Sequence, residues 1–237
     1  MVFEKDDALC FVKKLEDKSV NLCLTDPPYA VSRDTNFSKG EASGKDTDRF
    51  RVSYDFGEWD VVDLNYFRAL FKEVHNKLKV GGTCIVFYDL WKIQELKELL
   101  EEIGFKQFRF IEWIKTNPVP INSKVNYLTN SREVAITCVK GGKPTFHSEY
   151  DKGIYEYPIY QGKDRFHTTQ KPVKLFEDLL LKHSNEGDTV LDMFCGSATT
   201  LLACMNTKRV GIGCEKDPIY YEKARERLDG YKTKNNT

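Results

Sequence analysis

The 237-residue sequence has no net charge, no paired metal-binding cysteines and no long apolar run. Lys plus Arg and Asp plus Glu both number 36, so any nucleic-acid contact must come from a local basic surface. The seven cysteines never form a C-x-x-C pair, and the four histidines lack ligand spacing, which argues against a structural zinc. The cysteines are therefore expected to be small buried thiols in a reducing compartment.

The sequence also contains no secretory leader and no stretch of eighteen apolar residues. We therefore expect no membrane span and a cytoplasmic protein. The hydrophobic content of 41% is enough for one large domain, which we predict over residues 1–230, followed by a frayed tail at residues 231–237.

What the sequence does contain is an alternation of apolar strands and amphipathic helices, which predicts a mostly parallel, doubly wound α/β sheet of the Rossmann type. Two polar, turn-rich insertions interrupt it at residues 31–60 and 140–169, and insertions this long are usually functional or disordered. Predicted strands cover residues 1–5, 20–24, 83–88, 108–114, 133–139, 189–193 and 209–214; predicted helices end near Leu15, before Gly81-Gly82, at Ile103, near His183, at Met205 and near Leu228.

The tetrapeptide Asp26-Pro27-Pro28-Tyr29 follows the apolar run at residues 20–24. It therefore lies at the carboxyl end of a strand, where open α/β sheets bind ligands. Two prolines make a rigid loop whose carbonyls only accept hydrogen bonds, which suits an amino group, and Tyr29 offers a face for stacking a planar base. Alternatively, the segment is an ordinary proline-rich turn.

A second pattern, residues 192–200 with sequence DMFCGSATT, also follows a strand and opens a helix. Small residues there allow close approach of a ligand to the backbone, and the helix N-terminus presents N–H groups. Glu215 ends the next strand, where a carboxylate can accept hydrogen bonds from ribose hydroxyls. The two features together predict a nucleoside site, whereas a tight strand-to-helix turn is the alternative.

With these motifs the chain resembles the S-adenosylmethionine-dependent DNA amino-methyltransferases, in the circularly permuted group that places the catalytic tetrapeptide before the cofactor turn. The D-P-P-Y form looks most like adenine-N6 enzymes. The resemblance implies a class I methyltransferase fold, S-adenosylmethionine as cofactor, DNA as partner with its target base flipped out, and a homodimer as one expected assembly. Asp26, Pro27, Pro28 and Tyr29 are then the predicted catalytic residues.

The resemblance also assigns binding roles. The acid matching Glu215 holds the ribose, the acid matching Asp7 lies near the adenine of the cofactor, and residues 167–172 close over its methionine moiety. Residues 113–118 lie near the target base. The predicted cofactor-binding residues are Asp7, Asp26, Gln170, Lys171, Asp192, Phe194, Gly196, Ser197, Thr199 and Glu215, and the predicted substrate residues are Tyr29, Lys115, Asn117, Arg33, Arg49 and Arg51.

Several of these residues have simpler interpretations. Asp7 can cap a helix, Trp113 can be a core residue, Lys171 can neutralise a surface and Asn117 can open a turn. One residue departs from the family pattern, because Ala198 stands where glycine is common. Alanine disfavours positive φ, so either the helix has begun there or cofactor affinity is reduced.

The functional hypothesis is a DNA adenine-N6 methyltransferase. Two alternatives keep the chemistry and change the acceptor to cytosine N4 or to an RNA adenine. A third is a non-catalytic, nucleic-acid-binding partner subunit, which the intact tetrapeptide disfavours. A dinucleotide oxidoreductase would need a fuller G-x-G-x-x-G after the first strand and leaves the tetrapeptide unexplained.

Overall fold

The computed structural model describes residues 1–28, 64–118, 128–162, 165–167 and 169–235. The predicted insertion at residues 31–60 lies outside these residues, and so do the four predicted substrate residues Tyr29, Arg33, Arg49 and Arg51.

The described chain is built on an eight-stranded sheet with the strand order β1-β8-β7-β2-β3-β5-β4-β6. Strand pairing is parallel everywhere except at β5, which runs antiparallel to both of its neighbours. The strands are β1 (Val2–Lys5), β2 (Val20–Thr25), β3 (Leu78–Tyr88), β4 (Lys106–Lys115), β5 (Arg132–Val139), β6 (Ile154–Tyr157), β7 (Thr189–Asp192) and β8 (Val210–Glu215). The predicted mostly parallel α/β sheet is therefore confirmed.

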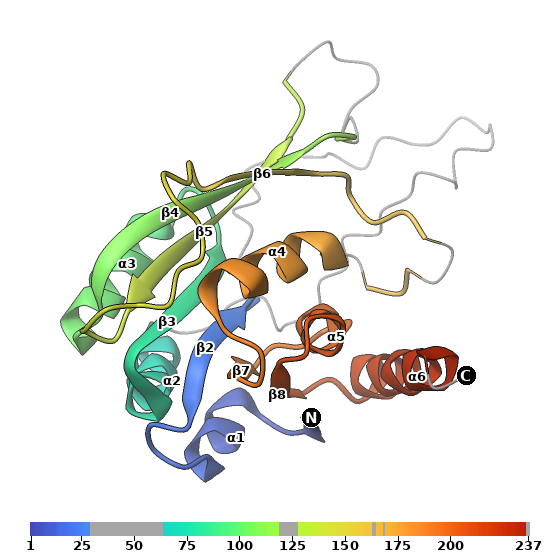
Figure 1. Ribbon diagram of the computed structural model, residues 1–237, viewed down its shortest axis with the longest axis horizontal. Coiled ribbons are helices and arrows are strands. Elements are labelled where there is room, and N and C mark those ends of the chain that lie inside the picture. The colour runs from blue at the N-terminus through green and yellow to red at the C-terminus, as the bar shows by residue number, and fades with distance from the viewer. Residues whose placement is uncertain (29–63, 119–127, 163–164, 168, 236–237) are drawn as a thin grey trace, which may run out of the picture.

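Helices cover both faces of this sheet (Figure 1). They are α1 (Ala8–Lys14), α2 (Leu64–Lys77), α3 (Ile93–Ile103), α4 (Val173–His183), α5 (Thr199–Asn206) and α6 (Pro218–Asn235). Helices α1, α2 and α3 pack on one face through buried residues such as Phe11, Phe71 and Leu100. Helices α4 and α5 pack on the other through Phe176 and Ala203, and α6 packs on α5. Because side chains alternate along a strand, neighbouring strand residues such as Cys23 and Leu24 serve opposite cores.

The two motif-bearing strands, β2 and β7, are neighbours in the sheet. Leu22 pairs with Val190 and Cys23 pairs with Leu191. Both strands run in the same direction, so the tetrapeptide and the glycine turn leave the sheet at the same edge. A permuted arrangement that brings together segments about 170 residues apart is therefore confirmed.

Three local predictions were wrong. Gly81-Gly82 does not end a helix: α2 ends at Lys77 and the glycines lie inside β3, where Gly81 has φ +82° and its N–H donates to Gly141 O over 2.9 Å. The insertion at residues 140–169 is not irregular throughout, because it contains β6, which pairs with β4. Only Tyr155 of the four residues of β6 is buried, so this strand carries no apolar run of the kind that marks β2 or β3.

The predicted frayed tail at residues 231–237 is also wrong, because residues 231–235 are helical. Helix α6 continues to Asn235, well past Leu228. Tyr231 lies partly buried against the core that α5 and α6 share, and its hydroxyl donates to Asn206 Oδ1. This tertiary contact holds the last turns of a segment whose composition alone resembles a frayed end.

Ala198 occupies the left-handed region, with φ 59° and ψ 32°, immediately before α5. The helix has therefore not begun at this residue, which excludes the first of the two alternatives for Ala198. Its side chain is fully buried in the core between α5 and α6. A left-handed L-residue costs about 1–2 kcal/mol, so the turn is held in a strained conformation by its packing.

Glycine at this position relieves that strain, and Ala203 in the helix that follows provides the control. Both Ala198 and Ala203 are fully buried, but Ala203 lies within α5. Ala203→Gly should lose helix propensity and a buried methyl, together roughly 2 kcal/mol, whereas Ala198→Gly should be at least ~1 kcal/mol less destabilising because it loses the strain. Urea unfolding of both variants measures this. Equal losses of stability would show that Ala198 is not strained.

Candidate functional site

Three acidic residues lie at the carboxyl edge of adjacent strands. Asp26 follows β2, Asp192 ends β7 and Glu215 ends β8, and these strands are consecutive in the sheet. This is the edge at which doubly wound sheets bind ligands. The sheet therefore brings the tetrapeptide and the glycine turn into one site.

The Asp26 carboxylate has one engaged and one unengaged oxygen. Oδ2 accepts a charge-assisted hydrogen bond from Lys171 Nζ over 2.5 Å. Oδ1 is buried and has no hydrogen-bond partner among the described residues. Burial raises the pKa of Asp26 above its usual range, the Lys171 ammonium opposes this, and the Glu133 carboxylate adds to it. Within the described chain, Asp26 thus has one oxygen that accepts from Lys171 and one that accepts from no donor.

Lys171 is a buried cation placed between two carboxylates. Its side chain is only 4% exposed and lies 2.9 Å from Glu133 Oε2 as well as beside Asp26. Its ammonium also lies over the Phe87 ring, 5.5 Å from the centroid. Lys171 therefore belongs to the interior of the site and does not neutralise an exposed surface.

Glu133, which no sequence motif marks, completes a chain of alternating charges. Its Oε1 contacts Lys115 Nζ over 2.8 Å. Burial raises the pKa of Glu133, but the two lysines outweigh burial and hold the pKa below its usual range. Because β5 is antiparallel, the beginning of this strand lies at the same edge as the end of β4. A search of strand ends could not find it.

Asp192 is fully engaged in the protein interior. Its Oδ1 accepts from Thr25 Oγ1 at 2.8 Å and from the Phe194 N–H at 3.1 Å, and its Oδ2 accepts from Thr200 Oγ1 at 2.5 Å. Burial raises the pKa of Asp192 to about 6, and these hydrogen bonds oppose the rise. Asp192 thus joins β2, β7 and α5, and fixes the turn that begins at Phe194.

The glycine turn is anchored to Glu215. The Gly196 N–H donates to Glu215 Oε2 over 2.7 Å, and the Asp217 N–H donates to Oε1 over 2.9 Å. Gly196 has φ +50°, which favours glycine. A Cβ there would lie 3.3 Å from the ring of His167, which packs against Tyr220 with centroids 4.4 Å apart. Burial lowers the pKa of His167 to about 4, so this ring is neutral near pH 7.

Gln170 is buried, and its side-chain amide is unsatisfied. The residue is 3% exposed, and neither Oε1 nor Nε2 has a hydrogen-bond partner among the described residues. Its backbone neighbour Lys171 accepts from Thr199 Oγ1 through its carbonyl at 3.4 Å, which places the segment against the start of α5. An unpaired buried amide is costly unless a ligand satisfies it, so this side chain fits a polar group of a bound molecule.

The start of α5 is held by hydroxyl and guanidinium contacts. Ser197 Oγ lies 3.1 Å from Thr199 Oγ1, and Arg227 donates to Ser197 O at 2.8 Å. Ser197 and Thr199 are both buried. Their hydroxyl groups therefore support the turn from within, and any role in cofactor binding stays a prediction.

Asp7 caps α1, as its simpler interpretation predicts. Its carboxylate accepts from the Leu9 N–H at 3.1 Å and from the Tyr66 hydroxyl at 3.1 Å, and Lys216 lies 3.3 Å away. The cap residue follows β1, which is the neighbour of β8 and parallel to it. Asp7 therefore lies at the same sheet edge as Glu215.

Residues 113–118, which were predicted to lie near the target base, include a core residue as well as residues at the sheet edge. Trp113 is 2% exposed and donates from Nε1 to Tyr157 O over 2.9 Å, so it is a core residue. Asn117 Oδ1 accepts from the Ile159 N–H at 2.6 Å and joins the end of β4 to the chain beyond β6. Lys115 is engaged by Glu133.

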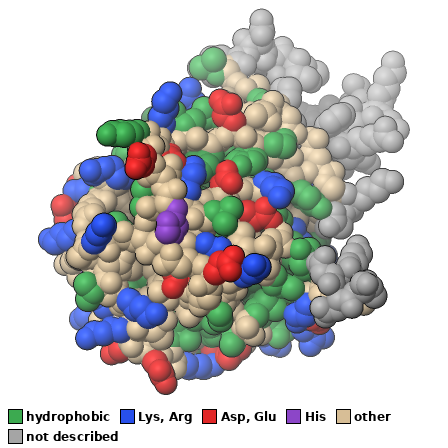
Figure 2. Space-filling model, in the orientation of Figure 1, with side chains coloured by type: hydrophobic (Ala, Val, Ile, Leu, Met, Phe, Trp, Pro, Cys, Tyr) green, Lys and Arg blue, Asp and Glu red, His purple; other side chains and the backbone are tan. Residues whose placement is uncertain are grey.

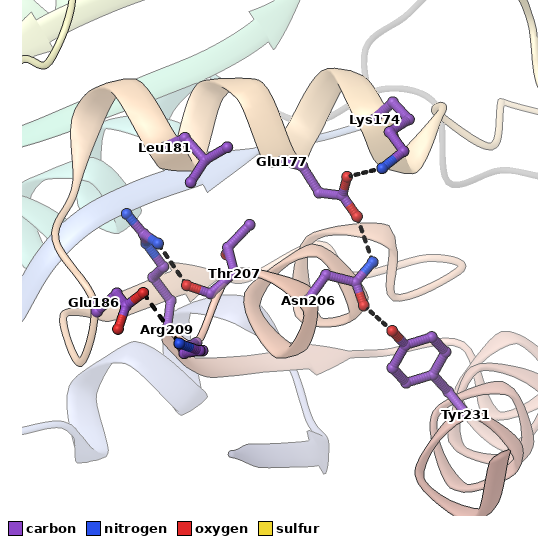
Figure 3. Close-up of a pocket in the computed structure, with 9 residues that line it drawn as sticks. Lys174, Glu177, Leu181, Glu186, Asn206, Thr207, Arg209 and Tyr231 are labelled. Atoms are coloured by element: carbon purple, nitrogen blue, oxygen red, sulfur yellow. Dashed lines mark hydrogen bonds and ion pairs between the residues drawn. The ribbon is translucent and has the colours of Figure 1, made fainter. Parts of the chain in front are cut away.

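A separate cleft lies between α4, α5 and α6 and is distinct from this site (Figure 3). Its residues Glu186, Lys208 and Arg209 lie in the connections that lead into β7 and β8, away from the carboxyl edge. Its polar groups pair with one another: Glu177 contacts Lys174 at 2.8 Å, and Lys208 contacts Glu186 at 3.4 Å. Both carboxylates of the cleft are therefore already paired with lysines, and Arg209 instead donates to the Thr207 and Ser184 carbonyls.

Neither the charges on the face drawn in Figure 2 nor the metal-ligand pattern of the described residues indicates a further site. On the face drawn in Figure 2, acidic and basic side chains are interspersed. Within the described ranges, no group of three His, Cys, Asp or Glu side chains is placed to hold a metal ion. The same ranges contain no helix with the length and apolar character needed to cross a membrane.

Known sequences match this chain over nearly its whole length. The profile of the N6_N4_Mtase family, described as DNA methylase, matches residues 20–226. The type II methyltransferase M2.DpnII of Streptococcus pneumoniae is 30% identical, with 97% of this chain and 90% of the relative covered. The type II methyltransferase M2.MboI of Moraxella bovis is 29% identical over 95% of this chain and 89% of the relative.

Solved structures agree with the fold. The M1.HpyAVI–SAM complex superposes with a TM-score of 0.70 at 28% identity, covering 95% of this chain and 98% of that one. The PvuII cytosine-N4-specific DNA methyltransferase superposes with a TM-score of 0.72 over 94% of this chain and 84% of that one, but at 19% identity it supports the fold alone. With its permuted sheet, its paired strand-end motifs and a family match over most of its length, the chain belongs to the N6_N4_Mtase family of DNA methylases.

Proposed function

We propose that this protein transfers a methyl group from S-adenosylmethionine to the N6 amino group of a flipped adenine in DNA. The observation that carries the proposal is Asp26 Oδ1, a buried oxygen at the sheet edge next to the glycine turn that has no hydrogen-bond partner among the residues that the structure describes. The D-P-P-Y form of the tetrapeptide supports adenine as the base.

The chemistry expected of Asp26 is acceptance of an amino N–H. An exocyclic amino nitrogen is a poor nucleophile because its lone pair is delocalised into the ring. Acceptance of its two N–H bonds by Asp26 Oδ1 and the Pro27 carbonyl would localise that lone pair and orient it. Lys171 fixes the carboxylate through the other oxygen, so little reorganisation is needed when a base arrives.

The residues of the glycine turn and Gln170 fit the cofactor. We assign Glu215 to the ribose hydroxyls, which would bind beside the Gly196 and Asp217 N–H groups that its carboxylate already accepts. Asp7 lies at the same edge, and the buried Gln170 amide can pair with a polar group of the methionine moiety. When bound, S-adenosylmethionine supplies an activated methyl on a sulfonium. A base within a duplex cannot reach this edge, so the target nucleotide must be extruded, at a cost of a few kcal/mol. Stacking of that base on Tyr29 stays a prediction.

Methyl transfer to genomic DNA tests the proposed function directly. Incubation with radiolabelled S-adenosylmethionine and unmodified DNA, followed by digestion to nucleosides, should place the label in N6-methyladenine. Label in N4-methylcytosine would overturn the choice of base. Absence of label despite measured cofactor binding would instead favour a non-catalytic partner subunit.

Removal of the Asp26 carboxylate should abolish transfer without preventing cofactor binding. Asp26→Ala is expected to lower the rate roughly 100-fold or more, because the amino group loses its acceptor. Lys171 keeps Glu133 as a counter-ion, so the variant should still fold. Asp17→Ala, which removes a 2.7 Å ion pair with Lys77 away from the sheet edge, is the matched control. An active Asp26→Ala enzyme would exclude the proposed role.

Replacement of Gln170 separates folding from cofactor binding. Gln170→Met keeps a similar volume and removes an unsatisfied amide, so the free protein should be about 1 kcal/mol more stable to urea. Its affinity for S-adenosylmethionine should fall about tenfold, because a hydrogen-bonding partner is lost. Gln94→Met, at an exposed position on α3 where the amide contacts Glu98, should leave affinity unchanged. Undiminished affinity in Gln170→Met would remove this residue from the cofactor site.

A further inference from the structure

Four charged side chains form a row at the carboxyl edge, in the order Asp26, Lys171, Glu133, Lys115. The Lys171 ammonium is 2.5 Å from Asp26 and 2.9 Å from Glu133, and Lys115 is 2.8 Å from the other oxygen of Glu133. The row carries equal numbers of positive and negative groups. The two inner residues, Lys171 and Glu133, each contact two side chains of the opposite charge.

The four side chains are largely buried, which strengthens the electrostatic interactions between them. The exposed fractions of the side chains are 4% for Lys171, 12% for Lys115, 18% for Asp26 and 22% for Glu133. Interactions between charges so shielded from water are only weakly screened. A change in charge at Glu133 is therefore felt at Asp26, although the two carboxylates meet only through the Lys171 ammonium.

We propose that Glu133 is a positioning residue for methyl transfer. Lys115 anchors Glu133, and Glu133 shares the Lys171 ammonium with Asp26. The ammonium is thereby held in place, but Asp26 is not its sole counter-ion. The inference rests on the proposed function of Asp26. Glu133 at the start of β5 and Lys115 at the end of β4 then control how strongly the Asp26 carboxylate accepts a hydrogen bond.

The physical basis is competition for one cation. If Lys171 paired with Asp26 alone, its full charge would stabilise the carboxylate and weaken it as an acceptor of an amino proton. With Glu133 present, the ammonium is divided between two carboxylates that also repel each other. Glu133 accordingly raises the pKa of Asp26, whereas Lys171 lowers it.

The other charged groups around Asp26 do not duplicate this role. Asp192, at the end of neighbouring β7, also carries a carboxyl group, but its two oxygens are occupied by Thr25, Thr200 and the Phe194 N–H. His167 lies in the segment before Lys171, and burial with its cationic neighbours lowers its pKa to about 4, so it is neutral near pH 7. Among the described residues, Glu133 is therefore the carboxylate that contacts the Lys171 ammonium besides Asp26.

The test is the pH dependence of methyl transfer in Glu133→Gln. The amide preserves size and can still accept from Lys171, but it removes the negative charge. Transfer requires ionised Asp26, so the rate falls on the acidic limb of the pH–rate profile as the pH drops through the Asp26 pKa. Loss of the Glu133 charge lowers that pKa, and the acidic limb should move to lower pH by about one unit. The rate above the limb should fall by up to about tenfold, because a less basic carboxylate is a weaker acceptor.

Two further variants separate charge from packing. Glu133→Asp keeps the charge and should keep the limb at the wild-type pH even if the rate falls. Glu112→Gln is a matched change on neighbouring β4, where Glu112 forms a partly exposed ion pair with Arg132. This variant should alter neither the rate nor the pH of the acidic limb. If Glu133→Gln does not fold, Lys115→Gln tests the same row by removing a positive charge. Glu133 then has Lys171 as its single cationic neighbour in the row and draws it from Asp26, so the acidic limb of the pH–rate profile should move to higher pH.

A titration without turnover keeps this inference distinct from the proposed function. Carbon-13 NMR of labelled aspartate carboxyl groups, with Asp26→Asn used for assignment, should show a lower Asp26 pKa in Glu133→Gln than in the wild type. An unchanged pKa and limb would overturn the role of Glu133. An upward shift would also overturn it, since it would mean that Glu133 serves only to hold Lys171 in place. If the wild type lacks methyl transfer, the proposed function fails while the titration still decides the coupling.

Discussion

The arrangement at the sheet edge depends on one buried ammonium. Lys171 is nearly excluded from solvent, and a cation in that position is tolerated only with close counter-ions. Asp26 and Glu133 supply them from β2 and β5, two strands separated in the sheet by β3. The ion pairs therefore hold the segment before α4 across the strand ends. They also determine which oxygen of Asp26 pairs with Lys171 and which has no partner among the described residues.

A second buried group, Asp192, sets the geometry of the other half of the site. Its carboxylate joins Thr25 on β2 to Thr200 on α5 and to the turn backbone at Phe194. Removing one partner from such a buried network leaves unsatisfied polar atoms, which typically costs about 1–3 kcal/mol for each group. The tetrapeptide and the glycine turn are thus connected by hydrogen bonds as well as by strand pairing. The strained backbone at Ala198 persists within this frame because the surrounding core holds it.

Much of this could be predicted from short-range patterns. Apolar runs located the strands, helical periodicity located most helices, and Asp26, Asp192 and Glu215 were found because each lies at the end of a parallel strand. Glu133 escaped the same reasoning because it begins an antiparallel strand, and strand direction is set by pairing between distant segments. The strand β6 and the last turns of α6 were missed because each depends on a neighbour, β4 in one case and Asn206 in the other, and has little signal of its own.

Residue order and local periodicity were enough to predict the fold class, the two motifs and the family resemblance. How the motifs act together depends on the three-dimensional packing: β2 lies beside β7, Lys171 is buried between two carboxylates, and the Gln170 amide has no partner among the described residues. These are distances between residues far apart in the chain. They arise from strand order and packing, which local sequence patterns do not specify.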